Sequence, residues 1–200
     1  MLIMHNGKSP KIHNEAYIAP DVTICGDVTI GAGARIMHGA RVVAEGGKVE
    51  IGDEVIVMQN AVVRATATHD CRIASNVLIG PTAHVVGATI EEEVFLATGT
   101  SIFHGSRIGT RSVVRIHGVV HVNTHLVAGS VVPIGWVAAG SPAELFSTDR
   151  ADALWAAQEP LKFARTVYGT DQPLNTCMKQ VTQAVSERLG SHVTDSIENP

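Results

Sequence analysis

Aliphatic residues recur at every sixth position along most of the chain. The series starts at Ile18, restarts at Ile51 after a short insertion and again after the loop at residues 66–72, and contains one five-residue step, from Val85 to Ile90. A helix needs apolar residues three or four apart, and an exposed strand alternates every second residue. A period of six therefore predicts neither a helix nor a simple exposed strand. The nineteen positions of the series are Ile18, Ile24, Ile30, Ile36, Val42, Ile51, Val57, Val63, Ile73, Ile79, Val85, Ile90, Leu96, Ile102, Ile108, Val114, Val120, Leu126 and Val132.

Small residues follow this series at a fixed distance. The fourth residue after each aliphatic position is typically small, as at Ala34, Ala61 and Ala83. One aliphatic side chain pointing inward per strand, with a small residue packed near each corner, predicts a coil of three short strands per turn. Such a turn needs about eighteen residues, so the repeat over residues 18–143 makes about seven turns. Pro142 cannot donate to a strand ladder and suits the exit from the coil.

The segments on either side of the repeat complete the expected domain plan. We expect a lead-in strand over residues 1–17, the β-helix over 18–143, a C-terminal helix packed on it over 144–168, and a helical or partly disordered tail over 169–200. Thr148 and Asp149 are expected to cap a helix over 152–158, which Pro160 ends. Apolar residues at helical spacing predict a second helix over 174–190, and the polar last ten residues are expected to fray.

Composition narrows the range of partners. The net charge is -4 with no long run of either sign, which argues against nucleic acid and anionic membranes as partners. Cys25, Cys71 and Cys177 are an odd number and form no CxxC pair, as is typical of a reduced, cytoplasmic protein. The first residues lack the apolar run of a signal peptide or membrane span, so neither is expected.

One column of the predicted coil has an unusual outer face. In the column built on Val42, Val63, Val85, Ile102 and Val120, the residue after each aliphatic position points away from the core. Apolar side chains gathered on an outer face indicate a protein interface. The outward residues of this column are Val43, Arg64, Val86, Phe103 and His121.

Several short motifs accompany the repeat: SPKIH at residues 9–13, GDVTIG at 26–31, the five-residue step after Val85, and GSPA at 140–143. With these motifs, residues 8–168 resemble the γ-class carbonic anhydrases and their ferripyochelin-binding-like and hexapeptide-transferase relatives. This resemblance implies an all-β fold, a left-handed parallel β-helix of hexapeptide repeats with C-terminal α-helices, assembled as a homotrimer with sites between subunits. The left hand rests on the resemblance, because parallel crossovers are otherwise right-handed.

The resemblance stops at the zinc site. Three histidines hold a zinc ion in these enzymes, and three neutral imidazoles leave a position where zinc can activate water. When VMQNAVVR and IGPTAHVVG are laid on the family motifs, Arg64, Pro81 and Val86 occupy the three ligand positions. Proline and valine offer no ligand atom, and an arginine stays charged and repels a cation. Zinc at the family site is therefore not expected.

Other polar residues of the same region supply an alternative site. His84, His104 and His121 could converge on an outer groove with Arg64 at one end and Phe103 as a wall, suited to a small anionic or acyl ligand.

Three functions stay open for this candidate site. The first is an acyltransferase that uses acyl-CoA, with His104 or His121 as general base. The second is a relocated zinc site made by the three histidines. The third is a non-catalytic trimeric binding or scaffold protein.

Four further histidines lie outside this region. His5, His13 and His192 lie outside the repeat or at its start, and His69 lies in a loop. For each of them the sequence favours an ordinary surface or turn histidine.

The exchange of all three ligand positions generates the first testable prediction. The chain, purified in the presence of zinc, is expected not to catalyse CO2 hydration efficiently, because no family ligand remains to hold the metal that activates water. Hydration followed by stopped-flow pH change measures this. Efficient hydration that a chelator abolishes would contradict the prediction.

Overall fold

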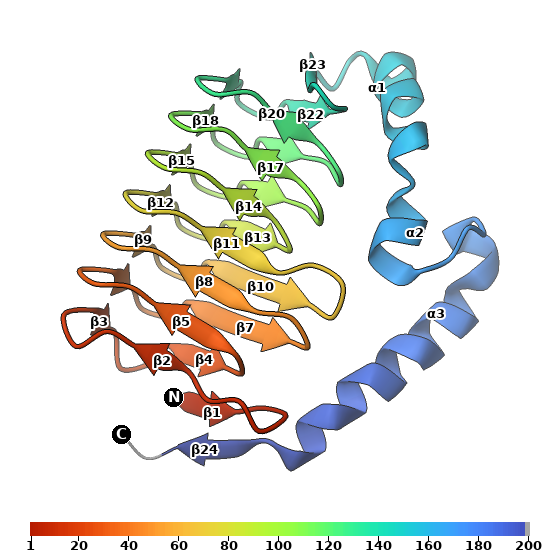
Figure 1. Ribbon diagram of the computed structural model, residues 1–200. Coiled ribbons are helices and arrows are strands. Elements are labelled where there is room, and N and C mark those ends of the chain that lie inside the picture. Colours follow the sequence, from red (N-terminus) through yellow and green to blue (C-terminus); the bar gives the residue numbers. More distant parts are fainter. Residues whose placement is uncertain (199–200) are drawn as a thin grey trace.

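The structure, a computed structural model that describes residues 1–198, is a left-handed parallel β-helix with helices along one side (Figure 1). Three sheets form its walls, with ten, seven and seven strands. The first sheet contains, in spatial order, β23 (Glu144–Phe146), β22 (Val137–Ala139), β19 (Val119–Val120), β16 (Ser101–Ile102), β13 (His84–Val86), β10 (Val62–Thr66), β7 (Arg41–Glu45), β4 (Thr23–Cys25), β1 (Leu2–Met4) and β24 (Ser196–Glu198). The second contains β2 (Lys11–Ile12), β5 (Val28–Ile30), β8 (Val49–Ile51), β11 (Cys71–Ile73), β14 (Thr89–Ile90), β17 (Arg107–Ile108) and β20 (His125–Leu126). The third contains β21 (Val131–Val132), β18 (Val113–Val114), β15 (Phe95–Leu96), β12 (Leu78–Ile79), β9 (Ile56–Val57), β6 (Arg35–Ile36) and β3 (Tyr17–Ile18).

The aliphatic residues that recur at every sixth position form the core of the coil. Every aliphatic position of the series except Ile18 is at most 3% exposed, and the small residues Ala34, Ala61 and Ala83 are fully buried. Parallel pairing places aliphatic residues of successive turns directly above one another, as for Val85 and Ile102. Each inward side chain therefore packs on its equivalents in the turns before and after it, which confirms the predicted all-β coil.

The coil begins earlier than the sequence indicated. β1 pairs in parallel with β4, β2 pairs with β5, and β3 pairs with β6, so residues 1–17 already contribute strands to all three sheets. The lead-in segment is part of the first turn, because its short strands find ladder partners one turn later in the chain.

The C-terminal segment returns along the coil. After β23, which pairs antiparallel with β22, come α1 (Ala151–Gln158), the short 3-10 helix η1 (Glu159–Leu161), α2 (Phe163–Tyr168), α3 (Leu174–Leu189) and the 3-10 helix η2 (Gly190–Thr194). These helices lead from the last turn back to the first (Figure 1), where β24 pairs antiparallel with β1. Residues 196–198 pair with β1 and residues 191–194 belong to η2, so the prediction that the last ten residues fray is wrong for the residues described. Residues 199–200 lie outside the described part.

The helix that follows the coil also differs from the expectation. α1 begins at Ala151, and its N-cap residue is Arg150, which makes no side-chain cap hydrogen bond, so the predicted cap by Thr148 and Asp149 is not found. None of its residues is buried, and Trp155 is 70% exposed rather than docked on the β-helix. Within residues 1–198, every helix is too short or too polar to span a membrane.

The stacked core generates a stability prediction. Ile79→Ala removes a fully buried side chain from the middle of the coil. It should lower the free energy of unfolding by about 2–5 kcal/mol, because the transfer free energy is lost and a cavity remains. Urea unfolding followed by circular dichroism measures this. Ile134→Ala, at a side chain that is 52% exposed, is the control and should have little effect. Equal losses in the two variants would contradict the packing described here.

Candidate functional site

The outward column of the first sheet is aligned as predicted. Arg64 pairs in register with Val43 on one side and Val86 on the other. Phe103 and His121 follow the paired residues Ile102 and Val120, and so continue the same column.

The same column is not an exposed interface. Val86 is 2% exposed and His121 is 9% exposed. Phe163 of α2 lies over the upper part of the column, with ring centroids 6.0 Å from Phe103 and 5.7 Å from His121. The prediction of several exposed apolar side chains is therefore wrong for Val86, which is buried, and Phe163 covers the column at Phe103 and His121.

Between the first sheet and these helices lies a groove, here called the helical groove. Its volume is about 840 Å³. His121 contributes from the coil, and the remaining walls come from α1, η1, α2 and the segment that leads into α3. The walls combine apolar surface with two cationic side chains, and one of these, Arg165, lies 3.4 Å from Asp171. The residues that define the groove are His121, Trp155, Gln158, Glu159, Lys162, Phe163, Ala164, Arg165, Thr170, Asp171, Gln172, Pro173, Leu174 and Asn175.

His121 is held in its neutral form. Burial lowers the pKa of its imidazole below 6.5. Its Nδ1 atom is buried and has no hydrogen-bond partner among the described residues. A neutral imidazole carries a lone pair on one ring nitrogen, so His121 can accept a proton at neutral pH.

His104 occupies a different environment. It follows Phe103 at the corner of the coil, is 6% exposed, and meets His69 edge-on with ring centroids 5.7 Å apart. Burial lowers the pKa of His104 to about 4, with further contributions from His69 and Arg64. The His69 loop approaches closely because Gly87, at φ 57°, has no side chain: a Cβ there would lie 2.6 Å from the His69 Cβ. His104 is thus enclosed beside this loop and does not line the helical groove.

Arg64 and His84 lie in turns of the coil that precede those of Phe103 and His121. Arg64 Nη1 is 3.6 Å from Glu45 Oε1, so the guanidinium is held by a carboxylate of its own chain. His84 is exposed and pairs in register with Val62, two residue pairs away from the Arg64–Val86 pair. Its pKa is lowered by partial burial and then by the charge of Arg64.

The three histidines proposed for a relocated zinc site do not converge within one chain. Among residues 1–198, His84, His104 and His121 do not form a group whose ligand atoms all lie within 4.8 Å of one another. His84 is the first residue of β13, before the inward Val85, whereas His104 lies two residues after the inward Ile102, beyond the end of β16. The geometry of a single chain gives this zinc site no support.

The residues at the family's zinc positions do not fit the metal either. Arg64 and Val86 are neighbours in the first sheet, whereas Pro81 follows β12 in the third sheet. A guanidinium paired with Glu45 and a buried hydrocarbon side chain offer no zinc ligand. We therefore derive no step through zinc at this position.

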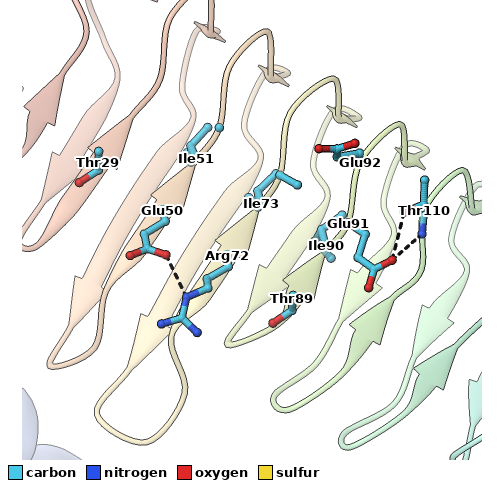
Figure 2. Close-up of a pocket in the computed structure, with 12 residues that line it drawn as sticks. Thr29, Glu50, Ile51, Arg72, Ile73, Thr89, Ile90, Glu91, Glu92 and Thr110 are labelled. Carbon is cyan, nitrogen blue, oxygen red and sulfur yellow. Dashed lines mark hydrogen bonds and ion pairs between the residues drawn. The ribbon is translucent and has the colours of Figure 1, made fainter.

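A second cavity of about 500 Å³ lies on the outer face of the second sheet (Figure 2). Arg72 Nε donates to Glu50 Oε2 at 2.9 Å, and Glu91 accepts from the backbone and side chain of Thr110. The residues that line this cavity include no histidine and no cysteine.

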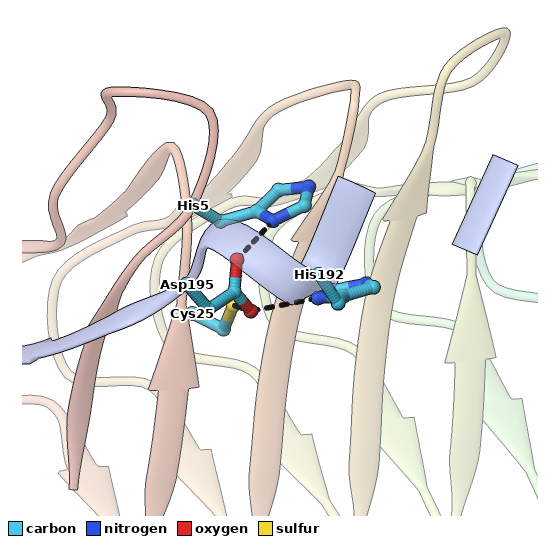
Figure 3. A group of neighbouring side chains, drawn as sticks. All are labelled: His5, Cys25, His192 and Asp195. Carbon is cyan, nitrogen blue, oxygen red and sulfur yellow. Dashed lines mark hydrogen bonds and ion pairs between the residues drawn. The ribbon is translucent and has the colours of Figure 1, made fainter. Parts of the chain in front are cut away.

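One cluster was missed by the sequence analysis. His5, Cys25, His192 and Asp195 meet at the first turn of the coil (Figure 3). His5 and His192 were expected to be ordinary surface or turn histidines, but His5 is only 3% exposed and both are hydrogen-bonded to Asp195. Because the four residues come from both ends of the chain, no local motif could have indicated them.

Comparison with known proteins agrees with the fold. The family described as "Bacterial transferase hexapeptide (six repeats)" matches residues 9–44. The Arabidopsis thaliana protein "Gamma carbonic anhydrase 1, mitochondrial" is 30% identical over 142 residues, which are 68% of this chain and 50% of the relative. "Gamma carbonic anhydrase 2, mitochondrial" of the same plant is 27% identical over 130 residues, 62% of this chain and 47% of the relative. The chain thus spans about half the length of these relatives.

A solved structure extends the comparison to three dimensions. It is a Bacillus cereus protein whose name carries an acetyltransferase assignment, with a TM-score of 0.53 and 23% identity over 79% of this chain and 91% of that protein. At this level of identity the likeness concerns the fold alone. Repeat, coil and relatives agree: the chain is a hexapeptide-repeat protein that resembles the γ-class carbonic anhydrases.

Proposed function

We propose that this protein is a cytoplasmic, homotrimeric acyltransferase that binds an acyl-CoA thioester in the helical groove and uses His121 as general base. The observation that carries the proposal is the position of His121, a buried and neutral imidazole in the wall of a groove of about 840 Å³. Imidazole is suited to proton transfer near neutral pH.

The walls of the groove match the parts of an acyl thioester. Trp155, Phe163 and Leu174 supply apolar surface for an acyl chain and the pantetheine arm. Lys162 and Arg165 supply cations for phosphate oxygens, to which they can donate charge-assisted hydrogen bonds. A volume of about 840 Å³ is in the range of sites that enclose small-molecule ligands.

The chemical step follows from the position of the imidazole. The acceptor, an alcohol, an amine or water, gives its proton to a ring nitrogen of His121 while its oxygen or nitrogen attacks the thioester carbonyl. The carbon–sulfur bond then breaks, and the departing thiolate takes a proton from the imidazolium. The acyl group moves to the acceptor and the thiol of coenzyme A is released, with no net change in oxidation state.

His121 is favoured over His104 as the base. A base with a pKa of about 4 is weak, and His104 is enclosed beside His69 rather than in the groove. Catalysis by a general base is most effective when its pKa lies near the working pH. Arg64, His84 and Phe103 flank this region, and Phe103 supports Phe163, whose ring is also in contact with His121.

The third sheet supports assembly with other copies of the chain. Its outward residues Ile56, Leu78, Phe95, Val113 and Val131 pair in register across five successive turns. Phe95 is 42% exposed and Val131 is 51% exposed. A continuous apolar stripe of this kind is typical of an interface, and we assign it to subunit contacts in the homotrimer.

The first prediction from this proposal concerns binding. Acetyl-CoA titrated into the protein should give saturable heat in isothermal calorimetry. Lys162→Ala should weaken binding about 10- to 150-fold, because a hydrogen bond to a charged group contributes about 1.5–3 kcal/mol. Lys179→Ala, on the exposed face of α3 and away from the groove, is the matched control and should bind as the wild type does. No binding at millimolar acetyl-CoA would overturn the proposal.

The second prediction concerns the base. With water as acceptor, release of free thiol from acetyl-CoA should fall about 10²–10⁴-fold in His121→Ala, while acetyl-CoA still binds. His104→Ala should retain most of the rate. Because protonation removes the lone pair, the rate should be lost as the pH falls through a value below 6.5.

The pH profile also separates the two histidines. If His104 were the base, the acidic limb would lie near pH 4. Binding of acetyl-CoA without any turnover would instead identify a non-catalytic binding protein.

A further inference from the structure

Four metal-ligating side chains meet where the two ends of the chain come together (Figure 3). His5 lies in the turn after β1, and Cys25 ends β4 in the next turn of the coil. His192 lies in η2 and Asp195 follows it, just before β24. Their ligand atoms all lie within 4.8 Å of one another, and no other such group of His, Cys, Asp and Glu is present within residues 1–198.

The Asp195 carboxylate is the centre of this cluster. His5 Nδ1 is 2.6 Å from Asp195 Oδ1, and His192 Nδ1 is 2.7 Å from Asp195 Oδ2. Cys25 Sγ is 3.9 Å from Asp195 Oδ2, and the two imidazole rings are stacked with centroids 4.3 Å apart. Two ring nitrogens and one sulfur thus surround the two oxygens of a single carboxylate.

Burial makes this arrangement unlike a surface ion pair. His5 and Cys25 are each 3% exposed, whereas the side chains of Asp195 and His192 are 19% and 31% exposed. The cluster is thus closed on the side of the coil and open on the side of η2, which leaves a path by which an ion can enter. Elsewhere in the chain, the His38–Asp21 pair has a similar distance of 2.8 Å but is fully on the surface and has no cysteine near it.

We propose that His5, Cys25, His192 and Asp195 bind one divalent transition-metal ion, with zinc preferred. Two imidazoles, one thiolate and one carboxylate form the mixed nitrogen, sulfur and oxygen donor set that zinc takes in tetrahedral sites. On binding, the Cys25 thiol releases its proton to solvent and the imidazoles coordinate in their neutral forms. The site is separate from Arg64, Pro81 and Val86, where the family holds its catalytic zinc.

A neighbouring amide is placed to orient one ligand. Asn6 Nδ2 lies 2.9 Å from His5 Nε2. When His5 binds a metal through Nδ1, its Nε2 carries a hydrogen and needs an acceptor. A half-turn of the Asn6 amide presents Oδ1 at the same place, which is the outer-sphere contact that metal-bound histidines commonly make.

The position of the site defines its role. With four protein ligands it has no open coordination position, as in structural zinc sites. It joins the first turn of the coil to the segment that carries η2 and β24, directly beside the antiparallel pairing of β24 with β1. A bound ion would clamp the C-terminal return onto the coil and so hold in place the helices that wall the helical groove.

Metal content and spectroscopy of the full-length protein test the proposal. Protein that is produced in the presence of zinc and then desalted should contain one zinc ion per chain, measured by inductively coupled plasma mass spectrometry. Replacement by Co²⁺ should give the d–d bands of tetrahedral cobalt together with a thiolate-to-cobalt charge-transfer band. Added zinc should raise the melting temperature of the metal-free protein by about 5 °C or more, because the ion binds only the folded state.

Three variants make the result specific. Cys25→Ser should abolish the charge-transfer band, and His192→Ala, at the most exposed ligand, should lose both the zinc and the thermal shift. His38→Ala removes the surface histidine of the matched pair and should behave as the wild type does. The proposal is overturned if the wild type binds neither zinc nor cobalt, or if Cys25→Ser and His192→Ala retain the full metal content and thermal shift.

Discussion

The stacking of one aliphatic side chain on the next, from turn to turn, is the interaction on which the whole structure depends. Parallel strands of successive turns lie about 4.8 Å apart, so equivalent inward residues are in van der Waals contact along the length of the coil. The series from Ile24 to Val132 is at most 3% exposed. Since this narrow core needs only one large side chain per strand, the outward positions can change without loss of the fold, as the residues at the family's zinc positions illustrate.

The ends of the coil impose a second constraint. A sheet that ends in an unpaired strand exposes backbone donors and acceptors to other chains. Here short antiparallel strands cover the two end strands of the parallel part of the first sheet, β23 on β22 and β24 on β1, and leave only these three-residue strands at its edges. The chain reaches from β23 at one end to β24 at the other through the C-terminal helices, here called the helical return. These helices form the groove that contains His121 and bring Asp195 into its cluster.

The sequence predicted which outward residues align between turns better than it predicted how exposed those residues are. The column of Arg64, Val86, Phe103 and His121 follows from the period of six and one five-residue step, and strand pairing reproduces it. The predicted solvent exposure of this column was wrong, because Phe163 of α2 packs against Phe103. The repeat pattern does not indicate where this helix lies. His84 and His104 were grouped by their closeness in the coil, but they precede and follow inward residues and so face different surroundings.

What the sequence alone determined is the coil: its period, its inward residues, its strands and the register between turns. These features depend only on neighbouring hexads, because the same pattern of aliphatic and small residues recurs in each of them. Only the tertiary structure decided which outward residues are covered, that His121 rather than His104 faces the groove, and that His5 and Cys25 meet His192 and Asp195. Such contacts depend on where the helical return lies over the coil, and packing between segments nearly two hundred residues apart, not any local pattern, sets that path.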